Sequence, residues 1–147
     1  MGRAMEVLLV DDNPADIRLM QEAFRETRVN STLRIAADGV QAMAYLRHQG
    51  SYANVPRPDI VLLDLNLPRM NGYEVLAEIK GDPSLRLIPV VVLTTSSSPD
   101  DIHRSYDLRA NCYITKPANI ERFIGAVRTI GEHWLKLASL PDSRISH

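Results

Sequence analysis

The feature of this chain that most constrains its fold is the alternation of short apolar runs with amphipathic stretches. The runs cover residues 6–10, 33–37, 60–63, 89–93 and 113–115. Runs this short, bounded by turn-forming or polar residues, are typical of buried parallel strands. Strands that alternate with helices predict an α/β fold, in which a parallel five-stranded sheet carries helices on both faces through right-handed connections.

Helices are predicted between these runs. Asn13 followed by Pro14 is typical of an N-cap with proline at the first helical position. The inward faces are predicted to be Ile17, Met20 and Phe24 after Pro14, then Val40, Met43 and Leu46 in 39–47, and Tyr73, Val75, Leu76 and Ile79 in a helix that ends at Gly81. Further helices are predicted over 96–108 and along a stripe from Ile120 to Leu137, and residues 49–58, with two prolines, are predicted to form a loop.

Reactive side chains stand where the apolar runs end. Asp11 and Asp12 follow the first run, Asp64 the third, Thr94 the fourth, and Lys116 with Pro117 the fifth. Ligands of open α/β sheets bind outside the carboxyl ends of the strands, at the point where the strand order reverses. The order 2-1-3-4-5 would bring the three aspartates to that point. An adjacent pair of acids is also common in solvated turns, but the coincidence with Asp64, Thr94 and Lys116 favours a functional pocket.

The chemistry of this pocket suits a divalent cation and a phosphoryl group. Mg²⁺ prefers oxygen ligands, whereas the four histidines are scattered and none pairs with Cys112. A carboxylate can attack phosphorus and carry the group as an acyl phosphate, with the incoming charge neutralised by the cation and Lys116. Thr94 could hydrogen-bond a phosphoryl oxygen and so sense it. Charge alone leaves open which carboxylate is the nucleophile.

The composition excludes several other classes of function. The net charge of -1 gives no reason to expect nucleic-acid binding, and no apolar stretch approaches the roughly 20 residues that span a bilayer. The N-terminus shows no apolar signal region, and a single cysteine allows no internal disulfide. We therefore expect a cytoplasmic protein that binds neither nucleic acid nor membrane.

The motifs resemble the receiver domain of two-component response regulators over roughly Val7 to Val127. They are Asp11-Asp12, Asp64-Leu-Asn-Leu-Pro-Arg-Met-Asn-Gly72, Thr94 and Lys116-Pro117. The resemblance implies a flavodoxin-like doubly wound (βα)5 fold with strand order 2-1-3-4-5. It implies a receiver domain over 5–138, followed by a flexible tail over 139–147.

The resemblance also implies a role for each site residue. Asp64 would accept a phosphoryl group from a phosphohistidine on a sensor histidine kinase. The implied Mg²⁺ ligands are Asp12, Asp64 and the backbone carbonyl of Asn66, with Asp11 acting through water. Thr94 and Lys116 would contact the phosphoryl group, and Tyr113 would be the aromatic switch residue. Such a chain is a phosphoacceptor that promotes its own phosphorylation and dephosphorylation rather than an enzyme.

Partners are implied in the same way. The motifs Leu-Asn-Leu-Pro-Arg-Met-Asn-Gly, Val-Leu-Thr-Thr-Ser and Asn-Cys-Tyr-Ile-Thr-Lys-Pro are similar to those of regulators that serve phytochrome-type light-sensing kinases. The face formed by helix 96–108, strand 113–115 and helix 120–137 would bind a partner or a second copy, and Trp134 extends the apolar stripe into a possible dimer interface. About 30 residues follow Lys116, too few for a DNA-binding output domain.

Other classes remain as alternatives. A phosphatase or phosphotransferase with an aspartyl-phosphate intermediate would typically place its nucleophile after the first strand, as Asp-x-Asp, and would add a cap. Here Asn13 and Pro14 follow the acidic pair, and no insertion is large enough for a cap. A receiver that binds partners without phosphorylation is a further alternative, and acids in place of a phosphate cradle disfavour a flavin binder.

Overall fold

The described part of the chain forms a parallel sheet with helices on both faces. The structure, a computed structural model, describes residues 4–27, 30–65, 67, 69–94, 112–115, 125 and 128–129. The strands are β1 (Met5–Val10), β2 (Ser31–Ala36), β3 (Ile60–Asp64), β4 (Val90–Thr94) and β5 (Cys112–Thr115). The helices are α1 (Pro14–Thr27), α2 (Gly39–Leu46) and α3 (Gly72–Gly81), with a short 3-10 helix, η1 (Gly50–Tyr52).

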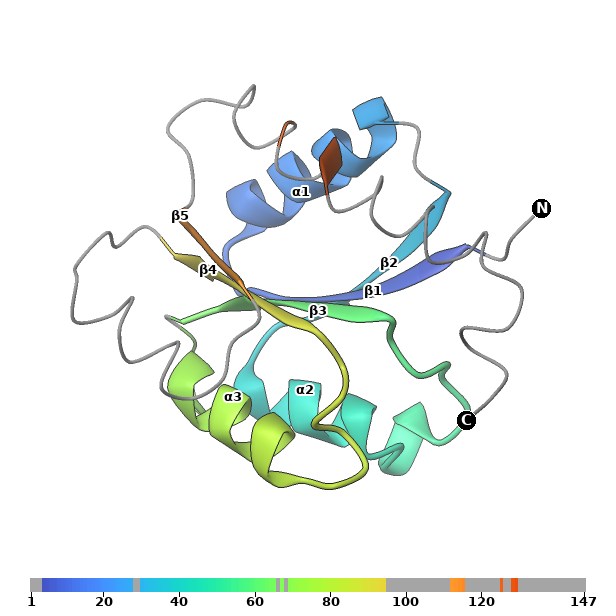
Figure 1. Ribbon diagram of the computed structural model, residues 1–147, viewed down its shortest axis with the longest axis vertical. Coiled ribbons are helices and arrows are strands. Elements are labelled where there is room, and N and C mark those ends of the chain that lie inside the picture. Colours follow the sequence, from blue (N-terminus) through green and yellow to red (C-terminus); the bar gives the residue numbers. More distant parts are fainter. Residues whose placement is uncertain are drawn as a thin grey trace.

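The strand order confirms the prediction. All neighbouring strands pair in parallel, in the order β2-β1-β3-β4-β5. Helix α1 lies on one face of the sheet, and α2 and α3 lie on the other (Figure 1). The carboxyl ends of β1 and β3 are therefore neighbours in the middle of the sheet, where the order reverses.

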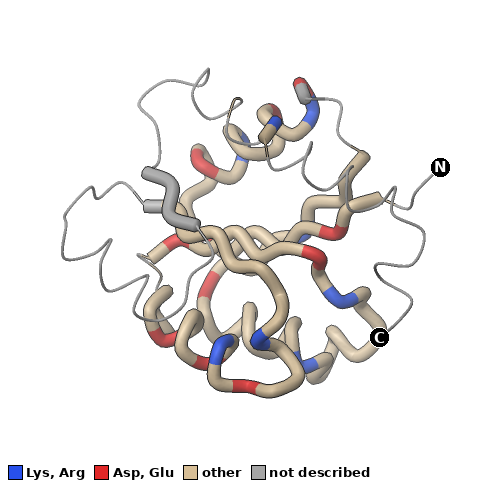
Figure 2. The backbone as a smooth tube through the Cα atoms, viewed as in Figure 1, with Lys and Arg blue, Asp and Glu red and all other residues tan. Residues whose placement is uncertain are grey.

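Each face of the sheet has its own apolar core because successive side chains of a strand point to opposite faces. In β1, Leu8 and Val10 belong to the cluster under α2 and α3, whereas Val7 and Leu9 belong to the cluster under α1. Every residue of β3 is buried. This accounts for the continuous apolar run, since an interior parallel strand has no solvent-facing side. Charged residues accordingly lie mainly on the helices and at strand ends (Figure 2).

Several strand boundaries differ from the sequence prediction by one or two residues, and the largest difference is at the start of β2. Strand β2 begins at Ser31, two residues before the predicted start, and ends at Ala36 rather than Ala37. Its polar start pairs with β1, with Ser31 opposite Met5. The predicted loop over 49–58 contains the 3-10 helix η1. There the Tyr52 ring lies 5.4 Å from that of Tyr45, which holds this connection against α2.

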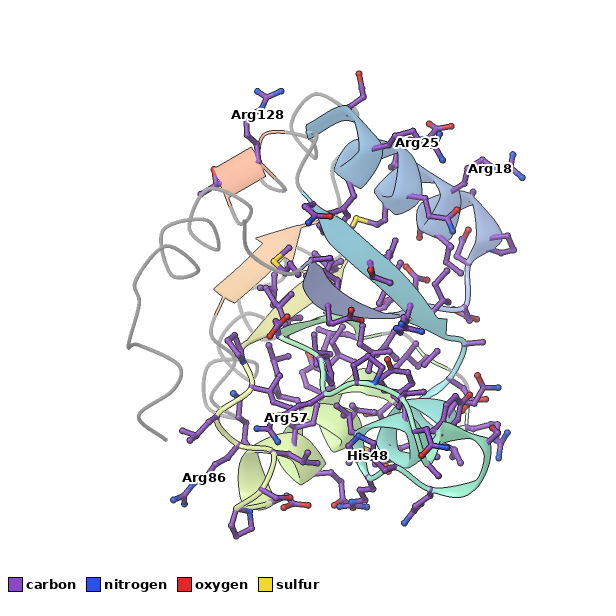
Figure 3. The ribbon with its side chains drawn as sticks, turned by 90° about the vertical axis from the view of Figure 1, so that its right-hand side faces the viewer. Arg18, Arg25, His48, Arg57, Arg86 and Arg128 are labelled. Carbon is purple, nitrogen blue, oxygen red and sulfur yellow. The ribbon has the colours of Figure 1, made fainter. Side chains whose placement is uncertain are left out.

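In α1, α2 and α3 the predicted inward faces are confirmed except at one position. Met20 and Phe24 of α1 are buried, while Arg18 and Arg25 point away from the sheet (Figure 3). In α2, Met43 and Leu46 are buried as predicted, but Val40 is 42% exposed, so its predicted inward orientation is wrong.

The remaining inward positions, in α3, follow the prediction: Val75, Leu76 and Ile79 are buried and Tyr73 is partly buried.

The predicted C-terminal helices fall largely on residues that the structure does not describe. Helix 96–108 and the tail 139–147 lie outside the described residues, and of the helix 120–137 only residues 125, 128 and 129 are described. Among the helices that are described, none has both the length and the apolar character that crossing a bilayer requires.

Candidate functional site: an acidic pocket at the ends of β1 and β3

Three carboxylates meet at the centre of the carboxyl edge of the sheet. Val10 pairs with Leu63, which places Asp11 at the end of β1 beside Asp64 at the end of β3. One oxygen from each of Asp11, Asp12 and Asp64 lies within 4.8 Å of the others. The predicted convergence of these three side chains is therefore present in the structure.

Asp11 and Asp12 are adjacent but occupy different environments. Asp11 is buried, and its Oδ1 accepts a hydrogen bond of 3.0 Å from the Asn13 backbone N–H. Asn13 in turn caps α1, because its Oδ1 accepts from the N–H groups of Ala15 at 2.9 Å and Asp16 at 3.2 Å. Asp12 is exposed. The Asp11 carboxylate thus shapes the turn into α1, and Asp12 faces solvent at the same edge.

Asp64 is held by the backbone that follows it. Its side chain is buried with the strand, at 5% exposure. The Gly72 N–H donates to the Leu65 carbonyl at 3.1 Å, which closes the loop between β3 and α3. A side chain at Gly72 would contact the Asp64 carbonyl oxygen and lie 2.5 Å from the Leu65 Cα. The glycine therefore allows α3 to begin directly against the backbone of Asp64.

The start of α3 is fixed by a capping box. Asn71 Oδ1 accepts from the Glu74 N–H at 3.0 Å, and Glu74 Oε1 accepts from the Asn71 N–H at 3.4 Å. This arrangement satisfies backbone donors that a helix start leaves unpaired. This box was not among the predictions from the sequence, although Asn71 followed by Glu74 three residues later is a recognisable signal for it.

Thr94 lies at the end of the strand next to β3. Asp64 pairs with Leu93 of β4, so Thr94 follows one residue further along that edge, and it pairs with Thr115 of β5. The backbone of Thr94 therefore lies at the same edge of the sheet as the pocket, and its side chain lies outside the described residues. Asn66, Lys116 and the side chain of Tyr113 lie outside the described residues.

The pocket carries an unfavourable concentration of negative charge. Two unit charges within 4.8 Å of each other repel by about 1 kcal/mol in water and by about 3 kcal/mol at the effective dielectric constant of a protein surface. A hard divalent cation with oxygen ligands would remove this repulsion. The donor set of three carboxylates therefore fits a divalent metal ion, with no sulfur or imidazole ligand among the described members of the cluster.

The fold and the acidic pocket together define a known class of protein. Residues 7–128 match the response regulator receiver domain, and the chain belongs to that family. It is 50% identical over 135 residues to the response regulator Rcp1 of Synechocystis, covering 92% of each chain. It is also 45% identical over 130 residues to a probable methanogenesis regulatory protein, FilR2, of Methanothrix harundinacea, covering 88% of this chain and 83% of that protein.

Solved structures agree with this assignment. The phosphorylated cyanobacterial phytochrome response regulator RcpA superposes with a TM-score of 0.85 at 56% identity, covering 94% of this chain and 99% of that one. The Mn²⁺-bound form of Rcp1 superposes with a TM-score of 0.82 at 50% identity, covering 93% and 99%. The chain is thus a response regulator receiver closely related to regulators of phytochrome signalling.

Proposed function

We propose that this chain receives a phosphoryl group on Asp64 from the phosphohistidine of a sensor histidine kinase, in a reaction that needs Mg²⁺. The observation that carries the proposal is the position of Asp64. It ends an interior strand, and its carboxylate lies within 4.8 Å of two further carboxylates. Membership of the receiver family and the similarity to phosphorylated RcpA support it.

The transfer is a displacement at phosphorus. An oxygen of the Asp64 carboxylate forms the new bond to phosphorus while the phosphorus–nitrogen bond of the phosphohistidine breaks. The electron pair of the broken bond stays on the imidazole nitrogen, which takes up a proton. The products are an acyl phosphate on Asp64 and a neutral histidine. Burial of Asp64 holds the attacking oxygen in one position before the donor arrives.

The residues that would hold Mg²⁺ are Asp12, Asp64 and the backbone carbonyl of Asn66, with Asp11 bound through water. The Mn²⁺-bound form of Rcp1 supports a divalent ion in this pocket. A bound Mg²⁺ would neutralise negative charge in the pocket, where an anionic phosphoryl group approaches three carboxylates. The commitment of Asp11 Oδ1 to the Asn13 amide fits an indirect role for Asp11.

An Asp12→Asn variant tests the metal site separately from the chemistry. Without added metal, we expect its free energy of unfolding to rise by about 1 kcal/mol, because one of three repelling charges is removed. Saturating Mg²⁺ should raise the melting temperature of the wild-type chain and leave that of the variant nearly unchanged. Differential scanning calorimetry with and without Mg²⁺ measures both effects. Equal stabilisation of the two chains by Mg²⁺ would place the ion elsewhere.

Thr94, Lys116 and Tyr113 complete the proposed switch. Thr94 and Lys116 would contact the phosphoryl group, and Tyr113 would turn inward as Thr94 moves. The parallel pairing of β4 with β5 supports this coupling, since it places the backbone of Thr94 beside that of Thr115, two residues from Tyr113. The result would be a shift in population toward an active form of the face made by helix 96–108, β5 and helix 120–137.

A Thr94→Ala variant should separate phosphorylation from switching. We expect it to accept the phosphoryl group on Asp64 but to reach the active form less completely, by about 10-fold, because it lacks a hydrogen bond to a charged group. NMR shifts of the Tyr113 ring on addition of beryllofluoride measure that population. A full wild-type response of Tyr113 would remove Thr94 from the sensing role.

The proposed partner is a sensor kinase of the phytochrome type, since RcpA is a phytochrome response regulator. We also propose that the chain forms a homodimer through the switched face or through Trp134. The proposed receiver domain extends over 5–138, and the proposed flexible tail extends over 139–147. The chain would act in the cytoplasm as a phosphoacceptor that promotes its own phosphorylation and dephosphorylation.

Intact-mass spectrometry after incubation with acetyl phosphate tests the proposal. We expect one phosphoryl adduct in the presence of Mg²⁺ and none after chelation. Continuous turnover of a generic phosphoester would instead indicate a phosphatase with an aspartyl intermediate. A folded, metal-binding chain that forms no adduct and does not bind beryllofluoride would contradict the proposal and indicate a receiver that acts without phosphorylation.

A further inference from the structure

The described residues of the loop between β3 and α3 make contacts at one side of the loop as well as at its ends. This loop, residues 65–71, leaves directly from Asp64 and contains Asn66, a proposed metal ligand. Its ends are closed by the hydrogen bond from Gly72 to Leu65. Its side contacts the first residues of α2, which begin after the neighbouring edge strand β2.

The lateral contact includes an ion pair. Asp38 is buried and caps α2, with its Oδ1 accepting from the Gln41 N–H at 2.8 Å. Its other oxygen, Oδ2, accepts from Arg69 Nη1 at 3.3 Å. Only 8% of the Asp38 side chain is exposed, whereas 61% of the Arg69 side chain is. A buried carboxylate has little contact with water, so its charge is stabilised mainly by its hydrogen-bond and ion-pair partners. Loss of this pair should therefore cost more than loss of an ion pair in which both side chains are exposed.

Two backbone features show that the contact is close. A side chain at Gly39 would collide with the Met70 carbonyl oxygen and lie 2.7 Å from the Met70 Cβ. Arg69 itself has a φ of 67°, in the left-handed region that non-glycine residues rarely adopt. Such a conformation persists where the surroundings determine it. The ion pair to Asp38 and the packing of Met70 on Gly39 are the surroundings that hold Arg69 in this conformation.

We propose that the Asp38–Arg69 ion pair positions the β3–α3 loop and thereby increases the affinity of the acidic pocket for its divalent ion. Arg69 and Asp38 act here as positioning residues: they hold the described backbone at Arg69 and Met70, in the segment that follows Asp64 along the chain, and they do not contact the ion. This inference rests on the proposed metal site at Asp12, Asp64 and Asn66. It adds that the start of α2, which contacts Arg69 and Met70, takes part in setting the geometry of that site.

The test compares two arginine variants with the same change of charge. Arg69→Gln removes the pair to Asp38, and Arg47→Gln is the matched control. Arg47 also joins α2 to α3, through a 3.0 Å contact of Nη2 with Glu78 Oε2. It lies at the C-terminal end of α2, whereas the pair of Arg69 with Asp38 lies at the N-terminal end. The probe is Mn²⁺, whose free concentration is read by electron paramagnetic resonance, with Mg²⁺ as competitor.

We expect Arg69→Gln to weaken Mn²⁺ and Mg²⁺ binding by about 5-fold. This loss is smaller than the roughly 10- to 100-fold that is typical of residues hydrogen-bonded to metal ligands, because Arg69 is largely exposed and acts only through the loop backbone. Arg47→Gln should leave both affinities within about 1.5-fold of wild type, since it lies at the other end of α2. Melting temperatures of the two variants show whether a difference in affinity merely follows a difference in stability.

Two further variants keep the inference falsifiable. Asp38→Asn retains a capping oxygen and loses the charge, and the double variant Asp38→Asn with Arg69→Gln should bind metal no more weakly than the worse single variant. Arg69→Lys should recover part of the affinity. Equal affinities in Arg69→Gln and Arg47→Gln, or fully additive losses in the double variant, would overturn the inference. A wild-type chain that binds neither ion would instead overturn the proposed metal site itself.

Discussion

The Asp64→Asn variant is expected to fold like the wild-type chain and to take up no phosphoryl group from acetyl phosphate in Mg²⁺. Asparagine has nearly the shape of aspartate, so the packing around this buried position is preserved. Its amide lacks the anionic oxygen that attacks phosphorus, so the loss should be complete within detection. Intact-mass spectrometry measures the adduct, and circular dichroism measures the fold.

A matched control lies at the other end of the same strand. Asp59 immediately precedes β3, and its Oδ2 accepts from the Glu6 N–H at 2.8 Å. Asp59→Asn makes the same chemical change and keeps an acceptor oxygen for that bond, so its phosphorylation should equal that of the wild-type chain. A persistent adduct on Asp64→Asn would move the nucleophile to Asp11 or Asp12, and peptide mapping would distinguish them.

The Gly72→Ala variant is expected to lose about 2 to 4 kcal/mol of stability and to impair metal binding as well. The added methyl group would meet the Asp64 carbonyl oxygen and the Leu65 Cα, which lies 2.5 Å away. Both are backbone atoms, so they cannot turn aside as a flexible side chain would. Either α3 or the end of β3 must move, and moving β3 displaces the Asp64 carboxylate.

Gly81→Ala provides the control for this prediction. Gly81 ends the same helix and is exposed, and apart from its chain neighbours and its own helical backbone no heavy atom lies within 4 Å of the position that a methyl group would take. Its replacement should be neutral or stabilising by up to about 1 kcal/mol, because alanine favours helix. Urea unfolding and Mg²⁺ titration of both variants are the measurements. Equal stabilities for the two would mean that the contact at Gly72 relaxes at little cost.

The interior strands could be predicted from sequence because each is buried on both faces. All five residues of β3 are buried, and so a single apolar run fixes the element and its end at Asp64. The edge strand β2 is half exposed and starts with Ser31 and Thr32. Its polar start carries no such signal, which explains why its predicted boundary was wrong.

The site was predictable only where it depends on strand ends. The convergence of Asp11, Asp12 and Asp64 follows from the strand order and the pairing of β1 with β3. The contact of Arg69 with Asp38 joins residues 31 positions apart and follows no periodic pattern. The sequence prediction also failed at Val40, because the inward position in the first turn of α2 belongs to Gly39, which packs against Met70 and has no side chain to mark it as apolar.

The strand order also divides recognition from response along the length of the chain. The acidic pocket draws its described carboxylates from residues 11 to 64, and the glycine that supports it is residue 72. The proposed responding groups begin at Thr94, on β4 and the edge strand β5. If the proposed roles hold, the segment from Thr94 onward can diverge to suit new partners while residues 11–72 keep the proposed metal site and the proposed phosphoacceptor. Related receivers could therefore acquire new downstream partners without a change in how they accept the phosphoryl group.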